Sequence, residues 1–261
     1  SQYLERQVYY YDGEQSRLTS IGKIVGHDST ITLIIDAMDQ AKFACPRHLP
    51  DSKTLQDLVR PRLHVVGVKI AGFMKKGWVI DPTIAKDADC WIEVVVRALW
   101  ESFKICQSRG VAIPKRLLIV SDNAGDNKNQ HTFKLSIIMV ASRFFKVMFN
   151  VQFRTGHSHD DIDAMFGLWA QFLVRQKTLE IPTDFVQALS AEFKDTSFEI
   201  MSHVREWSNY LADAMVSLAG ISGSVGTAHS FCWIRRKDYD EATYGCPSTS
   251  FPQAPHDGDI I

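Results

Sequence analysis

Two acidic residues follow predicted strands at widely separated points of the chain. Asp36 ends the β-branched run Ile31–Ile35, and Asp122 comes just after the apolar run Arg116–Val120. If these two strands are parallel neighbours, both carboxylates lie at the same edge of a sheet, where open α/β sheets bind their ligands. Further acids stand at the start of a later predicted helix, and one of them could complete the site.

Carboxylates gathered in a cleft repel one another unless a cation compensates their charge, so we expect a divalent ion at this edge. Oxygen ligands without thiolates favour Mg²⁺ or Mn²⁺ over softer metals. Two such ions can activate an attacking oxygen and stabilise the leaving oxygen of a phosphodiester. The chemistry that the acids imply is phosphoryl transfer on nucleic acid.

The segments that position these acids alternate between strand and helix patterns. Apolar or β-branched runs predict strands at residues 31–35, 64–73, 78–82, 116–120 and 146–153. Apolar residues at helical spacing predict helices at 87–106, 130–145 and 158–176, with more helix near 183–194 and 202–219. The tryptophans at this spacing, which are expected in the core, are Trp91, Trp100, Trp169 and Trp207. The predicted fold class is α/β, a mixed five-stranded sheet flanked by helices with a helical C-terminal extension.

Length and composition indicate one large globular domain with additions at its ends. The chain has 261 residues, of which 45% are hydrophobic and 23% charged, so it can bury a core. We expect an N-terminal extension at 1–30, a catalytic core at 31–180, a mainly helical extension at 181–236 and a poorly ordered tail at 237–261. The formal net charge of −1 provides no global basic field, so a nucleic acid would have to be held by a local patch.

The five cysteines are odd in number and form no C-x-x-C pair, which argues against a disulfide framework and a structural zinc site. They are expected to be reduced thiols in an intracellular protein. No apolar run is long enough to span a bilayer, so no membrane partner is expected. Because the sequence begins at Ser1 rather than Met, it is expected to be a fragment of a longer protein.

Three ordered blocks surround the acids, at residues 35–46, 121–129 and 156–167. They read Ile-Asp-Ala-Met-Asp-Gln, Asp-Asn-Ala-Gly-Asp-Asn-Lys-Asn and Gly-His-Ser-His, the last leading to Asp-Ala-Met-Phe-Gly. Together they resemble a transposon-derived eukaryotic family of integrase-catalytic-like domains, and more broadly the ribonuclease H-like catalytic cores of integrases and DDE/DDD transposases. The resemblance covers about residues 30–170.

The resemblance implies a ribonuclease H-like sheet and a metal-dependent nuclease or transposase of the DDD type. Asp36, Asp122 and Asp163 would be the catalytic residues and ligands of two Mg²⁺ or Mn²⁺ ions. DNA would be the partner, a nuclear location would follow, and strand transfer at paired ends would require a homo-oligomer. Asp163 also borders the apolar face of its predicted helix, which favours it over Asp160 as the third ligand; Asp160 remains a substitute.

Several polar residues beside the acids have two interpretations each. Asp39 is an auxiliary group behind the metal ligands or a solvated loop charge. Asn123 and Asn127 build an Asx-rich turn or present amides to a phosphate or a metal-bound water. His157 orients the substrate phosphate or a ligand, or it only bonds the backbone near the turn.

Two other functions remain open from the sequence. A catalytically inactive relic of a transposable element would act as a nucleic-acid or protein-binding module. A zinc hydrolase would use the motif His157-x-His159, which partly matches the H-x-H-x-D-H pattern of metallo-β-lactamase-like enzymes, but Ile162 stands where that pattern has its third histidine. This third possibility leaves Asp36 and Asp122 without a role.

Overall fold

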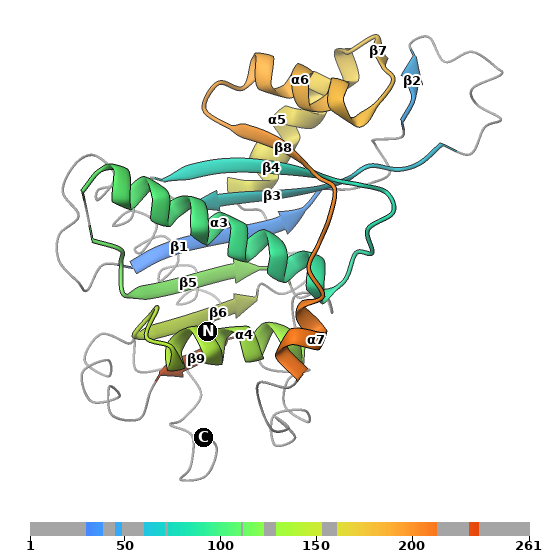
Figure 1. Ribbon diagram of the computed structural model, residues 1–261. Coiled ribbons are helices and arrows are strands. Elements are labelled where there is room, and N and C mark those ends of the chain that lie inside the picture. The colour runs from blue at the N-terminus through green and yellow to red at the C-terminus, as the bar shows by residue number, and fades with distance from the viewer. Residues whose placement is uncertain are drawn as a thin grey trace.

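A seven-stranded mixed sheet runs through the part of the chain that the computed structural model describes (Figure 1). The described residues are 30–38, 45–48, 60–70, 73–110, 112–122, 129–152, 161–212 and 230–234. In spatial order the strands are β8 (Ser197–Met201), β4 (Met74–Ile80), β3 (His64–Ile70), β1 (Thr30–Ala37), β5 (Arg116–Ser121), β6 (Val147–Gln152) and β9 (Ser230–Ile234). A separate two-stranded sheet pairs β2 (Arg47–His48) with β7 (Thr178–Leu179).

The strand directions divide this sheet at β1. On one side β1, β3 and β4 pair antiparallel in chain order, and β8 joins β4 in parallel at the edge. On the other side β5 and β6 are parallel to β1, and β9 closes that edge antiparallel to β6. The carboxyl ends of β1 and β5 therefore meet at one edge of the sheet.

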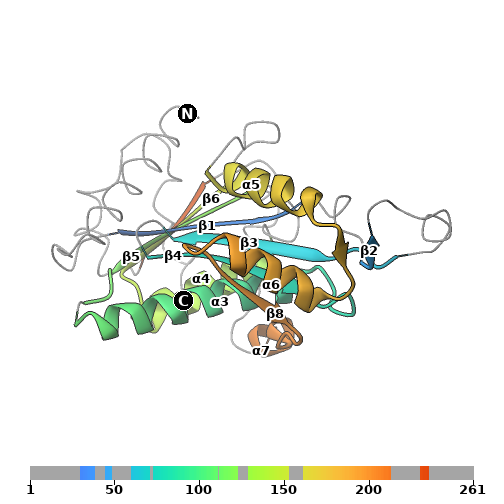
Figure 2. The ribbon, with the colours of Figure 1, turned by 90° about the horizontal axis from the view of Figure 1, so that it is seen from above.

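Helices cover both faces of the sheet, as Figure 2 shows for α5 (Asp161–Arg175) on one side and α3 (Ala88–Ser108) and α4 (Gln130–Ala141) on the other. Side chains of α5 and α6 (Pro182–Glu192) share one hydrophobic cluster with the sheet. Those of α3, α4 and α7 (Trp207–Ala212) share the second. Successive side chains of β1 point to opposite faces of the sheet. Ile34 belongs to the cluster of α5 and α6 (the α5 cluster), and Ile35 belongs to the cluster of α3, α4 and α7 (the α3 cluster).

Asparagine and aspartate begin the two helices of the α3 face. The side chain of Asp87 caps α3 by accepting from the amides of Asp89 and Cys90. Asn129 caps α4 in a capping box with Thr132. The last asparagine of the Asp122–Asn129 block is thus a helix cap.

Within the described residues, no helix combines the length and apolar character that a membrane span requires.

The predicted α/β class is confirmed, and the five predicted strands and three main helices all form. The predicted number of strands was wrong. Two short strands, β8 and β9, come from the segment expected to be mainly helical, and they extend the sheet to seven strands. Both are edge strands of five residues, and β9 is held by tertiary contacts such as the ring of Phe231 against Phe133, which local patterns cannot reveal.

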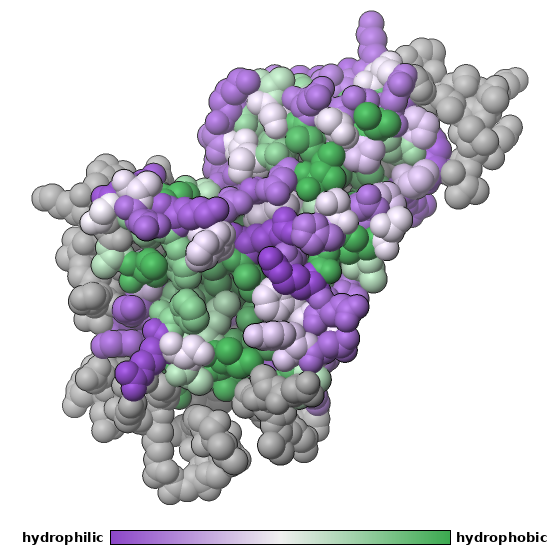
Figure 3. Space-filling view, in the orientation of Figure 1, coloured by the Kyte–Doolittle hydropathy of each residue, from purple (hydrophilic) through white to green (hydrophobic). Residues whose placement is uncertain are grey.

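One tryptophan expected in the core is instead exposed. Trp100 on α3 is 59% exposed, and the ammonium group of Lys104 lies 5.6 Å from the centre of its ring. Figure 3 shows hydrophobic and polar residues in separate patches on the surface over α3. Trp91 and Trp169 are buried as predicted.

Two glycines allow α5 to lie close against the sheet. Gly67 on β3 pairs directly with Gly77 on β4. A Cβ atom at Gly67 would overlap the ring of Phe166, and one at Gly77 would come within 2.7 Å of Phe198 and 3.1 Å of Trp169. The absence of these two side chains leaves the space that Phe166 and Trp169 of α5 and Phe198 of β8 fill, so the glycine pair sets the distance between helix and sheet.

We therefore expect Gly67→Ala to lower the free energy of unfolding by about 1–3 kcal/mol, because the added methyl group overpacks the contact with Phe166. Urea denaturation followed by circular dichroism measures the change. The matched control is Gly167→Ala on α5, where an added Cβ meets nothing within 4 Å and should stabilise the helix by up to about 1 kcal/mol. Equal stabilities for the two variants would contradict the role given to the glycine pair.

Candidate acidic site at the sheet edge

Asp36 lies at the carboxyl end of β1 on the face that α5 covers. Residues two apart on a strand point to the same face, so Asp36 shares the face of Ile34, which belongs to the α5 cluster. Its register partner on β3 is Gly67. The amide of Ala37 donates a 2.7 Å hydrogen bond to Oδ1 of Asp36. The carboxyl group is thus held at the sheet edge by its own backbone, beside the glycine on which Phe166 packs.

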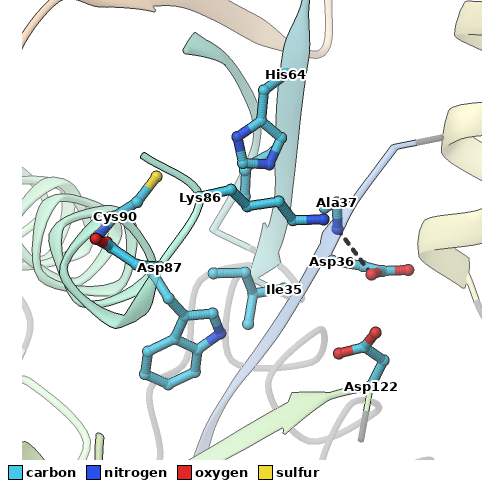
Figure 4. Close-up of a pocket in the computed structure, with 10 residues that line it drawn as sticks. Ile35, Asp36, Ala37, His64, Lys86, Asp87, Cys90 and Asp122 are labelled. Atoms are coloured by element: carbon cyan, nitrogen blue, oxygen red, sulfur yellow. Dashed lines mark hydrogen bonds between the residues drawn. The ribbon is translucent and has the colours of Figure 1, made fainter. Parts of the chain in front are cut away.

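Asp122 lies directly after β5, the parallel neighbour of β1. The register pairs Ile34 with Val120, and two further residues along each strand bring Asp36 level with Asp122. Figure 4 shows the two carboxyl groups next to each other at the end of the two strands. The expectation that parallel strands would bring Asp36 and Asp122 together is confirmed.

Asp163, near the start of α5, contributes to the same electrostatic environment. The pKa of Asp36 is raised to about 6, first by burial and then by the negative charges of Asp122 and Asp163. The bond from Ala37 and the positive charge of Lys86 act in the opposite direction without cancelling the effect. Two acids from distant parts of the chain therefore act on Asp36. Among the residues described, no three His, Cys, Asp or Glu side chains form a ready-made metal-binding group.

A small pocket lies against Asp36 and Asp122, on the side of the sheet edge that faces α3. Its lining includes His64 at the start of β3, Lys86 in the loop before α3, and Trp91 on the first turn of α3. Figure 4 shows the imidazole of His64 directed toward the side chain of Lys86, whose amino group points toward the end of β1. The pKa of His64 is lowered to about 4 by burial and by the charge of Lys86, so the ring is neutral at pH 7.

Sequence reasoning did not single out His64 and Lys86 as site residues. The available signal was a histidine at the first position of an otherwise apolar strand, together with a lysine just before a helix cap. Neither signal is specific, because a histidine at a strand end and a lysine in a loop are common. The pairing of β3 beside β1 brings His64 to the acids, and the loop between β4 and α3 brings Lys86 there.

The remaining predicted site residues lie outside the described part of the chain. They are Asp39, Asn123, Asn127, His157 and Asp160, together with His159 of the zinc alternative. Their roles stay predictions.

The raised pKa of Asp36 implies a measurable loss of stability at neutral pH. The folded state holds the proton more tightly than the unfolded chain, so stability falls as the pH rises from about 4 to about 6. Asp36→Asn removes this penalty and keeps an oxygen for the amide of Ala37. In buffer with a chelator we expect it to raise the free energy of unfolding at pH 7 by about 1–3 kcal/mol. The gain should shrink toward zero at pH 4.

The matched control is Asp195→Asn, because the pKa of Asp195 is lowered by its hydrogen bond from Lys75. The sign is opposite there: Asp195 stabilises the fold above its unfolded pKa, so its replacement should give no gain at pH 7. Chemical denaturation of both variants across pH 4–7 measures the difference. A gain for Asp36→Asn that is independent of pH would show that its carboxyl group does not carry the raised pKa.

Comparison with known proteins gives one match. No curated protein and no solved structure matches the chain. A family model described as a domain of unknown function, DUF7869, matches residues 53–243, which include Asp122 and Asp163 and lie after Asp36. The match covers more than half of the chain, and the protein therefore belongs to the DUF7869 family of domains of unknown function.

Proposed function

We propose that the protein is a metal-dependent nuclease or transposase with a ribonuclease H-like core, acting on DNA through Asp36, Asp122 and Asp163. The strand order β4-β3-β1-β5-β6 supports the fold, with three consecutive antiparallel strands followed by two strands parallel to the first. This is the order expected for ribonuclease H-like integrases. The strands β8 and β9 are additions at the two edges.

The observation that carries the proposal is the position of Asp36 and Asp122 side by side at the carboxyl ends of two parallel strands, with Asp163 near enough for its charge to act on Asp36. The three acids come from β1, the end of β5 and α5, and the pKa of Asp36 is raised by burial and, to a smaller extent, by the charges of the other two. A structural role gives no reason to gather like charges at a sheet edge. A bound cation would give such a reason, because a divalent ion removes the repulsion between the carboxylates that the protein alone leaves in place.

The donor set fits a hard divalent ion, since it consists of carboxylates and contains no thiolate. Asp36, Asp122 and Asp163 would hold Mg²⁺ or Mn²⁺, two ions in the active form. When bound, these ions would activate the attacking water or 3′-hydroxyl and stabilise the leaving oxygen. The chain's own part is positional: the carboxylates must be deprotonated to bind, so loading requires a pH above the raised pKa of Asp36, and the edge of the sheet would keep the acids on one side of the phosphodiester.

The proposal includes DNA as partner, assembly into a homo-oligomer for strand transfer, and a nuclear location where the substrate is found. The second candidate is a relic that retains the acids and binds nucleic acid or protein without turnover. The raised pKa of Asp36 favours the active form, because an acid cluster without a cation lowers stability and has no evident benefit in a pure binding module.

Titration with Mn²⁺ by calorimetry, beside a cleavage assay on labelled double-stranded DNA, tests the proposal. We expect the wild type to bind Mn²⁺ and to nick DNA. Asp122→Asn and Asp163→Asn should each weaken Mn²⁺ binding at least about tenfold and abolish nicking. Binding in the wild type should also weaken as the pH falls below 6, since Asp36 must lose its proton.

The control acid is Asp195, which is 65% exposed and pairs with Lys75 away from the acidic site. Asp195→Asn should leave Mn²⁺ binding and nicking unchanged. Metal binding without nicking would point to the relic. Absence of Mn²⁺ binding in folded wild-type protein would refute the metal site.

A further inference from the structure

The pocket beside the acids has a second wall, and this wall carries hydrogen-bond donors. Lys86 is exposed and extends its ammonium group toward the end of β1 (Figure 4). His64 and Trp91 line the same pocket from β3 and α3. Asp36 and Asp122 lie on one side of this pocket, and the groups with N–H donors lie toward β3 and α3, together with Asp87, the N-cap of α3.

The donors of this wall are not used by the rest of the protein described here. His64 is 6% exposed, and neither ring nitrogen has a hydrogen-bond partner among the described residues. The same holds for Nε1 of Trp91, whose side chain is 8% exposed. Buried donors without partners cost about 1–3 kcal/mol each, so two of them in one pocket indicate a site for an external acceptor.

Size and charge restrict what that acceptor can be. The pocket offers about 40 Å³ of space to water, which corresponds to roughly three water molecules. This volume suits the outer oxygens of one phosphate group and is too small for a nucleobase. The Lys86 ammonium supplies the positive charge, and the pocket lies over the start of α3, a helix of 21 residues with its positive end there. The Asp87 carboxylate already accepts from two amides of that helix.

We infer that this pocket binds a phosphate group of the substrate through Lys86, His64 and Trp91, next to the phosphate on which the acids would act. The inference rests on the proposed function for its substrate, a nucleic-acid strand, and adds the residues that hold the strand's phosphate. His64 donates as the neutral imidazole, Trp91 donates through Nε1, and Lys86 provides the charge. A second phosphate contact beside the acids would fix the direction of the strand across the sheet edge.

Two-dimensional ¹H–¹⁵N spectra of the full chain test the inference without any metal, in buffer with a chelator at constant ionic strength. The signal is the Nε1–H resonance of Trp91, assigned by its absence in Trp91→Phe. The probes are inorganic phosphate, the dinucleotide TpT, and TpT with an uncharged methylphosphonate linkage. We expect phosphate and TpT to shift the Trp91 resonance in a saturable way, and the methylphosphonate to leave it unchanged.

Two substitutions should move phosphate binding in opposite directions. Lys86→Gln should weaken it about tenfold, because a charge-assisted bond is lost. Asp122→Asn should tighten it by roughly two- to fivefold, because a repelling carboxylate beside the pocket is removed. The matched control is Lys104→Gln, an exposed lysine farther along α3, which should change nothing.

These outcomes separate the inference from the proposed function. If the protein binds Mn²⁺ but no phosphate shifts the Trp91 resonance, the phosphate site is refuted and the metal site stands. If phosphate binds and Mn²⁺ does not, the metal site is refuted and the phosphate site stands. Equal phosphate binding by wild type and Lys86→Gln overturns the inference, and a shift with inorganic phosphate but not with TpT shows that the pocket takes free phosphate rather than a nucleic-acid strand.

Discussion

The close contact between α5 and the glycine pair Gly67–Gly77 is the constraint on which the acidic site depends. Asp163 stands one helical turn before Phe166, the residue whose ring occupies the space above Gly67. Gly67 is in turn the register partner of Asp36. The packing of one aromatic ring on one glycine therefore links the helix that carries the third acid to the strand that carries the first. A larger side chain at that glycine would overlap the ring of Phe166 and so disturb the contact between this helix and the sheet.

The site is held in place at a cost in stability that the core must offset. Burial and two neighbouring carboxylates favour the protonated form of Asp36, while burial beside Lys86 favours the neutral form of His64. Both residues belong to central strands, and the apolar residues around them, such as Ile35, Val65 and Val66, are almost fully buried. Destabilised polar groups on central, buried strands suit a binding site, because paired strands keep like charges near each other when a loop would let them separate.

Local sequence patterns were sufficient for the parts of the fold that are regular and buried. The runs before Asp36 and Asp122 identified both central strands, and the parallel pairing followed from the topology. The edge strands β8 and β9 were not predictable, because a five-residue strand at an edge is defined by its neighbour rather than by its own periodicity. Trp100 was misplaced because helical spacing identifies an apolar stripe but does not show which stripe faces solvent. The donors His64 and Trp91 were missed because an unpaired nitrogen is a property of the packed structure.

Acids and N–H donors line the same pocket, and the proposed phosphate site explains why they occur together. An acidic wall alone repels a phosphodiester, since Asp122 and Asp163 already raise the pKa of Asp36. A donor wall alone binds anions without bringing them to any reactive group. In the proposed function a divalent ion on the acids would remove their repulsion, and a strand with one phosphate on Lys86 would present the next along its backbone to the acids. The antiparallel pairing of β3 with β1 puts the start of one strand beside the end of the other, so His64 and Asp36 arrive at the same edge although they face opposite sides of the sheet.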